Sequence, residues 1–274
     1  MNYRIKIFSL IPFLLFLLVP AAKNNEVKTQ GNTKNVLKLE VGEELVYVVR
    51  YSVMRLGEVK VVVTGKEEIK GKDYFSAGVY IDSYPGIPFV NLHQVYETTM
   101  TPDYYSKYFK GILKHDNYDS NTEYHFDYNN SIVKIHKWLT NSNKPPVDST
   151  CVVHKKYQDG LSIFYYARAH SLQKKYEIIP TFVNEKKVST EINFNTEEED
   201  ESIDAVDYDI DCTHLEGKVN FISVFGLTGD FEGWFSNDDE AIPIKAKMNV
   251  LIGSVTLELK SWKRSGWNPP RYKD

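Results

Sequence analysis

The sequence predicts a mainly β protein: a strongly curved antiparallel sheet of about ten strands, shaped as an open barrel or half-barrel, with one short helix packed against it. Apolar and polar residues alternate over most of the chain, as in strands that have one buried face. The connections are too short to hold crossover helices, so neighbouring strands should be antiparallel. The 274 residues include 19 Tyr and 14 Phe, whose large rings pack well on a pleated surface.

Residues 1–22 differ from the rest and predict a secretory signal peptide. Arg4 and Lys6 form a basic start, an apolar run extends from Ile7 to Val19, and small residues suited to cleavage end at Ala22. The run of about 13 residues is short beside the roughly 20 of a membrane-spanning helix, so a retained anchor is the weaker alternative. We therefore expect an exported protein that has no transmembrane anchor after cleavage.

The rest of the chain predicts one domain. Residues 23–40 are polar and lack a period, which indicates a flexible leader. Residues 41–264 carry the alternating pattern of a single β domain, and residues 265–274 form a C-terminal tail. Removing residues 1–22 takes away two basic residues and no acids, so the formal net charge changes from −4 to −6. This acidic balance argues against a nucleic-acid partner, which requires a basic patch.

The first predicted strand pair lies near the start of the domain. Apolar residues occupy every second position from Leu45 to Val53 and again from Val59 to Val63. Met54 to Gly57 separate the two runs, which predicts a strand, a turn and a strand.

The same pattern recurs toward the C-terminus. Strand patterns with turn residues between them cover residues 124–128 and 132–135 around Asn129-Asn130, residues 188–194 after a turn at 183–186, and residues 242–250 and 255–259 around Gly253. Pro145-Pro146 predict a loop.

Only the segment from Gln158 to Ala169 breaks the period of two. Its apolar side chains follow the spacing i, i+3, i+4, i+7 from Leu161 to the stem of Arg168, which predicts a helix. Asp159 is placed to cap the start of this helix.

Nine acidic residues between Glu197 and Asp211 raise the question of a calcium site. From Val206 to Cys212, however, apolar residues alternate with aspartates, which predicts a strand with the aspartates on its wet face. Glu197 to Glu201 then predict a solvated turn. We prefer this interpretation and predict no metal site.

The histidines and cysteines offer two further candidates. None of the seven histidines has the spacing of a zinc helix or finger. His125 and His136 can face each other across Asn129-Asn130, where we expect a surface pair rather than a metal site. Cys151 and Cys212 can form one disulfide in an oxidising compartment, or they can be small buried residues.

No catalytic residue and no cofactor site are predicted, so we expect that the protein is not an enzyme. Ser162 lacks the Gly-x-Ser-x-Gly pattern of a nucleophile and falls in the first turn of the predicted helix. Asp238-Asp239-Glu240 lie between two strand patterns, before Pro243, and predict a hairpin turn rather than a catalytic carboxylate pair. The sequence contains no glycine-rich phosphate-binding loop, and it leaves the ligand-binding residues undefined.

Several stretches resemble a known family when they are taken in order. They are Gly42–Tyr47, Leu56–Val59, Gln158–Arg168, Gly233–Ile244 and Gly253–Leu259. Together they are similar to the exported bacterial proteins grouped as domain of unknown function 3108, with a resemblance that spans Val41 to Trp262. The Gly233–Ile244 stretch also looks like the strand-turn-strand of periplasmic lipoprotein carriers, which are curved half-barrels with an apolar inner face.

The resemblance implies an address in the periplasm or outer cell envelope of a Gram-negative bacterium, and it implies no catalytic residues. With the curved sheet and the many aromatic residues, it favours non-covalent binding of a lipid or other amphipathic envelope component between sheet and helix. The alternative is a scaffold that binds envelope protein or polysaccharide through exposed aromatics such as Tyr104, Tyr105 and Tyr108.

Overall fold

The computed structural model describes residues 37–87, 91–194, 197–221, 227–250 and 253–273. The chain divides into two units, residues 1–34 and 35–274, and the fold below is that of the second unit alone. The predicted signal peptide and most of the predicted leader lie outside the described residues.

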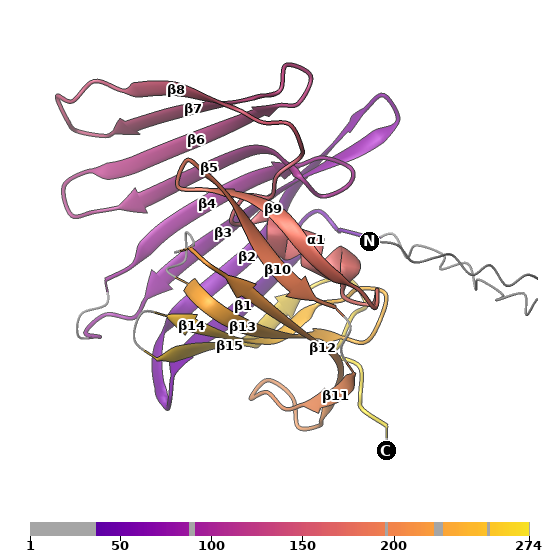
Figure 1. The fold of residues 1–274 in the computed structure, drawn as a ribbon. Helices are drawn as coiled ribbons and strands as arrows, with labels where there is room; N and C mark the ends of the chain where they lie inside the picture. The colour runs from indigo at the N-terminus through magenta and orange to yellow at the C-terminus, as the bar shows by residue number, and fades with distance from the viewer. Residues whose placement is uncertain (1–36, 88–90, 195–196, 222–226, 251–252, 274) are drawn as a thin grey trace, which may run out of the picture. The chain divides into compact units, whose positions relative to one another are not determined.

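The described part of the chain forms fifteen strands and one helix (Figure 1). In chain order they are β1 (Glu44–Tyr51), β2 (Met54–Ile69), β3 (Lys72–Ser83), β4 (His93–Met100), β5 (Ser106–Lys114), β6 (Asp119–Asp127), β7 (Ile132–Leu139), β8 (Val147–Val152), α1 (Ser162–His170), β9 (Tyr176–Val183), β10 (Lys186–Asn193), β11 (Glu198–Glu201), β12 (Ile210–Val219), β13 (Leu227–Ser236), β14 (Pro243–Val250) and β15 (Ser254–Lys263).

All fifteen strands belong to one antiparallel sheet. Its order is β8-β7-β6-β5-β4-β3-β2-β1-β15-β14-β13-β12-β10-β9, and β11 pairs with β12 beside this path. Among the described strands β8 and β9 end the path without pairing with each other, so the sheet is not closed into a barrel. The predicted fold class is confirmed, with more strands than the roughly ten expected from alternation.

The sheet curls so that β9 and β10 cross in front of the first strands (Figure 1). The Phe182 ring of β9 contacts the Tyr124 and Phe126 rings of β6, with centroids 5.1 and 5.8 Å apart. The segment before α1 also meets β9, because the Gln158 N–H donates to the Pro180 carbonyl and the Gln158 carbonyl accepts from the Phe182 N–H, both at 2.8 Å. We call the face of the sheet that is turned toward α1 the inner face.

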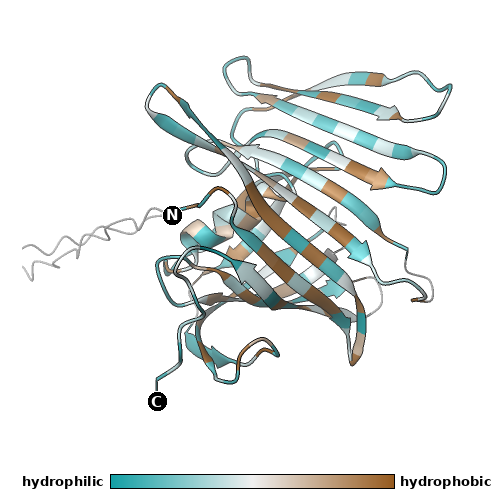
Figure 2. Cartoon of the chain, turned by 180° about the vertical axis from the view of Figure 1, so that it is seen from behind, coloured by the Kyte–Doolittle hydropathy of each residue, from teal (hydrophilic) through white to brown (hydrophobic). Residues whose placement is uncertain are grey.

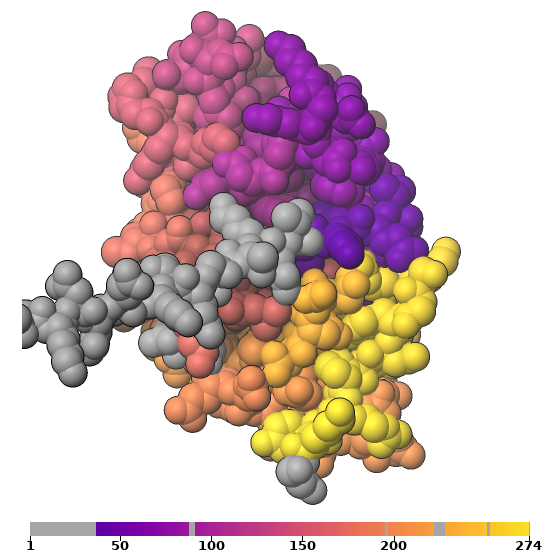
Figure 3. Space-filling view, turned by 90° about the vertical axis from the view of Figure 1, so that its right-hand side faces the viewer, coloured from indigo at the N-terminus to yellow at the C-terminus, as the bar shows by residue number. Residues whose placement is uncertain are grey.

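The strands place their connections at two ends of the curled sheet. One end, which we call the helix end, holds α1 together with the start of β1, the β4–β5 turn and the β13–β14 turn, as ion pairs and ring contacts to α1 show. The opposite, hairpin end holds the β1–β2, β3–β4, β5–β6, β9–β10 and β14–β15 connections. Figure 3 faces the helix end, where indigo atoms of the first strands lie beside yellow atoms of the C-terminal segment.

Most predicted turns are confirmed, and brown and teal bands alternate along the strands in Figure 2. The turns at Asn129-Asn130, Val183–Lys186 and Asp238–Glu240 each join two paired strands, and Pro243 opens β14. A Cβ on Gly57 would lie 2.3 Å from the Asp82 carbonyl oxygen, so only glycine permits this close approach of β2 and β3.

Two predictions around the acidic segment are wrong. Glu198–Glu201, expected in a solvated turn, form strand β11, which pairs with β12 through Glu201↔Ile210 and Glu198↔Thr213. The predicted strand from Val206 instead begins at Ile210. Alternation alone could not distinguish a solvated turn from a short strand at Glu198–Glu201. This strand pairs through its backbone, and its side chains are carboxylates that contact side chains of β12, β13 and β14.

The segments on both sides of the predicted domain, the end of the predicted leader and the predicted tail, are packed against the fold. Leu37 is buried, and its carbonyl accepts from the Tyr104 hydroxyl at 2.9 Å. Trp267, in the predicted tail, is buried and donates its indole N–H to Asp238 at 2.8 Å. The backbone of Arg271 forms an isolated antiparallel β-bridge with Ile210. In the described part of the chain, no helix has the length and apolar character needed to cross a membrane.

Candidate functional site

The inner face is tightly packed at the helix end. Leu45 of β1, Ile244 of β14 and Leu259 of β15 are fully buried there, and Tyr165 of α1 packs in the same cluster. A second cluster joins Tyr166 of α1 to the strands β9, β10, β12 and β13. The helix therefore fills this end of the curled sheet with side chains.

Toward the hairpin end, the same face becomes progressively exposed. In β1 the inner-face residues pass from buried Leu45 and Tyr47 to half-buried Val49, and in β15 they pass from Leu259 to half-buried Leu257. The other strands that reach this end repeat the trend. We call the resulting set of half-buried apolar side chains the inner-face patch: Val49, Val59, Ile81, Leu113, Phe231, Met248 and Leu257.

Glycines bring aromatic rings flat against the sheet next to this patch. A Cβ on Gly217 of β12 would lie 2.0 Å from Cζ of Phe231, its partner on β13. Gly111 of β5 likewise lies under the Tyr96 ring, which a Cβ would meet at 3.2 Å. Because glycine has no side chain, each ring occupies the space that a side chain would fill.

A buried polar cluster fixes the start of α1. The Asp159 carboxylate accepts the backbone N–H groups of Leu161 and Ser162, both at 2.7 Å, and the Thr98 hydroxyl at 2.6 Å. The Ser162 hydroxyl donates to the Gln158 side-chain oxygen at 2.7 Å. The N-cap residue of α1 is Leu161, so Asp159 does not occupy the cap position itself but holds the start of the helix from two residues before it. Ser162 has a structural role at the first turn of a helix that begins at Ser162.

A buried charged cluster holds the other side of α1. Arg168 donates to both carboxylate oxygens of Glu43, at 2.6 and 3.3 Å, and to the Glu240 carbonyl at 3.1 Å. Arg264 also donates to the Glu43 and Glu240 carboxylates. We call these four residues the charged cluster. It ties the helix to the start of β1, the β13–β14 turn and the end of β15.

The electrostatics of these groups follow from their burial and partners. Burial acts to raise the pKa of Glu43, but Arg168 and Arg264 together hold this pKa below its usual value. Burial raises the pKa of Asp159 despite the hydrogen bonds that it accepts. Both carboxylates are occupied by contacts inside the fold, so they serve the docking of α1.

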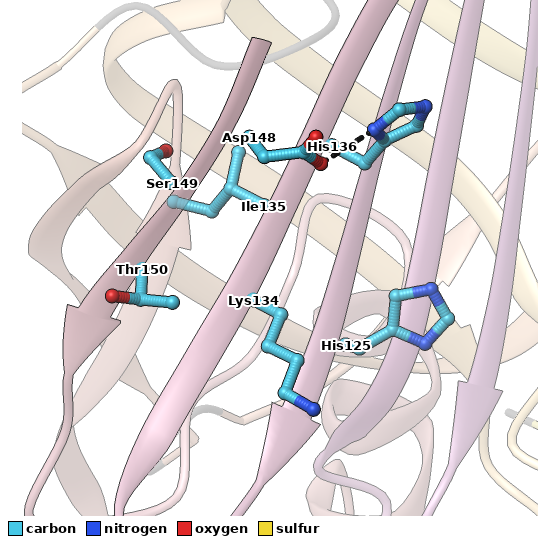
Figure 4. Close-up of a pocket in the computed structure, with 7 residues that line it drawn as sticks. All are labelled: His125, Lys134, Ile135, His136, Asp148, Ser149 and Thr150. Carbon is cyan, nitrogen blue, oxygen red and sulfur yellow. Dashed lines mark hydrogen bonds and ion pairs between the residues drawn. The ribbon is translucent and has the colours of Figure 1, made fainter. Parts of the chain in front are cut away.

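A separate shallow depression of about 500 Å³ lies on the outer face of β6, β7 and β8. Figure 4 shows its lining residues, with the His136 imidazole bonded to Asp148 at 2.7 Å. The structure places His125 opposite Lys134 and His136 opposite Glu123, so the two histidines share a face without pairing directly. Within the described residues, no group of three or more His, Cys, Asp or Glu is arranged to hold a metal ion.

Cys151 and Cys212 both have free thiols in this structure. Cys212 lies on β12, is fully buried, and has a pKa raised by that burial. Cys151 lies half-buried on the end strand β8. The structure thus has Cys212 as a small buried residue, one of the two alternatives that the sequence left open.

The three tyrosines suggested as an exposed row do not lie together. Tyr104 packs on the core and bonds to the Leu37 carbonyl, and Tyr105 contacts Tyr166 of α1 with ring centroids 5.4 Å apart. Of the three, only Tyr108 lies on the outer face, where its ring centroid is 4.9 Å from that of His125.

Fold and site together define a barrel-like antiparallel sheet whose helix fills one end and whose apolar inner face is exposed at the other. The chain matches the family described as "Protein of unknown function (DUF3108)" over residues 46–260, and it belongs to that family. A comparison with curated proteins finds no match.

Two solved structures are similar to this chain. A beta-barrel-like protein of domain of unknown function DUF1849 from Brucella abortus aligns with a TM-score of 0.52 at 10% identity, over 81% of this chain and 97% of that one. This likeness shows the fold alone. A putative exported protein with a YmcC-like fold from Bacteroides fragilis aligns with a TM-score of 0.38 at 8% identity, over 84% of this chain and 99% of that one.

Sequence reasoning missed the charged cluster and the inner-face patch. Glu43 lies within one of the stretches that carry the family resemblance. It directly precedes an apolar strand, and a charged residue buried at such a position requires a partner of opposite charge, which was the available signal. The patch left no comparable signal, because half-buried and buried apolar residues have the same alternation.

Proposed function

We propose that the protein acts by binding, without catalysis, and that its ligand is a lipid or another amphipathic component of a bacterial cell envelope. The apolar part of the ligand lies on the inner-face patch, and its polar part remains at the hairpin end in water. The predicted export signal supports an envelope location, in the periplasm or at the outer envelope of a Gram-negative bacterium.

The rise in exposure along the inner face carries this proposal. Apolar side chains normally stay exposed singly, whereas contiguous apolar surface marks a binding site. Here the half-buried residues come from strands that are neighbours in the sheet, such as Val59 opposite Ile81 and Phe231 opposite Met248. An acyl chain fits such a surface, because each methylene group removed from water contributes about 0.8 kcal/mol.

The arrangement of α1 supports the same proposal. The helix end is filled by side chains and held by the charged cluster, so we place ligand entry at the hairpin end. The two buried carboxylates, Glu43 and Asp159, are both engaged in holding α1. This gives them structural roles and supports binding rather than catalysis.

Two neighbouring residues of β5 provide a matched test. Leu113 belongs to the inner-face patch, whereas Ile112 lies on the outer face, and both are half-buried. The wild type, Leu113→Glu and Ile112→Glu would each be titrated with a fluorescent long-chain fatty acid. Leu113→Glu should weaken binding at least about tenfold, since it places a carboxylate where the acyl chain lies, and a tenfold change equals about 1.4 kcal/mol.

The outer-face variant separates binding from stability. Ile112→Glu should bind within about twofold of the wild type, and circular dichroism should show both variants folded. Equal loss in the two variants, or no uptake by the wild type, would refute an acyl-binding inner face.

A further inference from the structure

We propose that the free edge of β9 docks an extended, acidic segment of a partner protein, which adds a strand to the sheet. This surface is distinct from the inner-face patch, and the inference does not depend on the ligand proposed above.

Only part of the outer edge of β9 pairs with other residues of the described chain. β9 ends the sheet path, and its outer edge pairs within the described chain only near Thr181, where Gln158 bonds to the backbone of Pro180 and Phe182. Outward groups recur at every second residue of a strand, so the N–H and carbonyl of Ile178 point to the same side as the Pro180 carbonyl. The stretch from Tyr176 to Ile179 therefore presents strand-pairing groups to solvent.

The side chains on this stretch are unusually apolar for an edge. Tyr176 is 59% exposed and Ile178 is 60% exposed, and nearby Leu172 is 40% exposed. The Tyr176 hydroxyl donates to Glu191 of the neighbouring strand β10 at 2.9 Å, which holds the ring over the face of the sheet next to this edge. Natural sheets protect free edges with lysine, proline or short strands, and an exposed apolar edge marks a pairing surface. The proline of β9, Pro180, lies on the part of the edge that Gln158 already covers, so it does not protect the stretch from Tyr176 to Ile179.

The opposite edge of the sheet shows such protection. β8 has only six residues, follows Pro145-Pro146, and carries Asp148 and polar neighbours. Val147 and Val152 are exposed at its two ends, without a continuous apolar row. β8 is therefore the natural control edge.

Local charge identifies the partner chemistry. Lys156 pairs with Asp103 at 2.5 Å and Lys175 pairs with Glu177 at 2.8 Å. Lys155 and Lys174 lie in the same two segments, before Gln158 and before β9, and have no ion-pair partner among the described residues. An acidic strand would face both lysines, so this local charge favours an acidic partner.

An extended peptide binds such an edge through backbone hydrogen bonds, and its alternate side chains supply specificity. The matching segment alternates apolar residues, which meet Tyr176 and Ile178, with Asp or Glu. Its backbone would bond to the part of the β9 edge next to the part that Gln158 already occupies.

The test uses two capped peptides of about six residues, enough to cover the edge, one alternating Glu with Val and the other Lys with Val. Backbone amide spectra and hydrogen exchange of the full domain would be recorded with each. The acidic peptide should shift and protect the Ile178 amide in the millimolar range or tighter, and the basic peptide should not. Equal effects from both peptides, or shifts that map elsewhere, would overturn the proposal.

Ile178→Pro removes the outward N–H, and an edge position whose N–H faces solvent tolerates proline. This variant should lose at least about tenfold in affinity for the acidic peptide while the β10 amides keep their shifts. Val147→Pro, at the first residue of β8, should leave peptide binding unchanged. Concentration-dependent pairing of two β9 edges, detected by sedimentation, would replace the acidic partner with a second copy and refute the proposal.

Discussion

Breaking the charged cluster should destabilise the fold far more than breaking a surface ion pair. Arg168→Met keeps most of the side-chain volume but leaves the Glu240 carbonyl without its donor and leaves Glu43 with Arg264 alone. Removing one partner of a buried pair costs about 3–5 kcal/mol, and the remaining Arg264 places Arg168→Met near 3 kcal/mol. Glu43→Gln leaves the fully buried Arg168 facing no carboxylate and should cost about 4 kcal/mol.

Urea unfolding followed by the fluorescence of the four tryptophans measures these losses. The matched control is Lys66→Met, which breaks a 2.8 Å pair with Asp73 in which both side chains are 44% exposed, and it should cost less than about 1 kcal/mol. The double variant Glu43→Gln/Arg168→Met should cost less than the sum of the single variants by about 2 kcal/mol, because each single change strands the other partner. A loss of under about 1 kcal/mol for Arg168→Met, similar to the surface control, would refute a stabilising role for the cluster.

Three further outcomes follow from the same contacts. Glu43 has a lowered pKa in the fold, so its stabilising effect is present above its unfolded pKa of about 4.3 and is lost as the pH falls through the lower folded value. The difference in unfolding free energy between the wild type and Glu43→Gln should therefore become smaller when urea unfolding is repeated at acid pH. Asp159 has a raised pKa, so Asp159→Asn should cost little near neutral pH in calorimetry, whereas Asp159→Ala, which leaves two buried N–H groups unpaired, should cost about 2–3 kcal/mol. Gly217→Ala should force the Phe231 ring off the strand and cost about 1–3 kcal/mol in urea unfolding, whereas Gly65→Ala, with its nearest atom 4.0 Å away, should not.

The period of two was sufficient to predict an antiparallel sheet from the sequence, and the resemblance to curved half-barrels supplied its curvature. Turn residues such as Asn129-Asn130 located the hairpins, and the single break in the period located α1 and the Asp159 that holds its start. These features are local, since each depends on residues within a few positions of one another.

The site could not be predicted in the same way, because it depends on distant pairs. Glu43 meets Arg168 across 125 positions of the chain, and no spacing rule reports such a contact. Alternation identified the inner face of β1 but could not show that Val49 would be more exposed than Leu45, because that difference depends on where α1 lies. β11 was missed since its four residues are all acidic and have no apolar face to signal a strand.

Native mass spectrometry of the mature protein, purified from its own cell envelope, tests the central proposal most directly. The account predicts that one amphipathic molecule stays bound to the wild type and to Ile112→Glu but is lost from Leu113→Glu. A wild-type protein that is empty after gentle purification, or a bound molecule retained equally by all three, would contradict ligand binding on the inner-face patch.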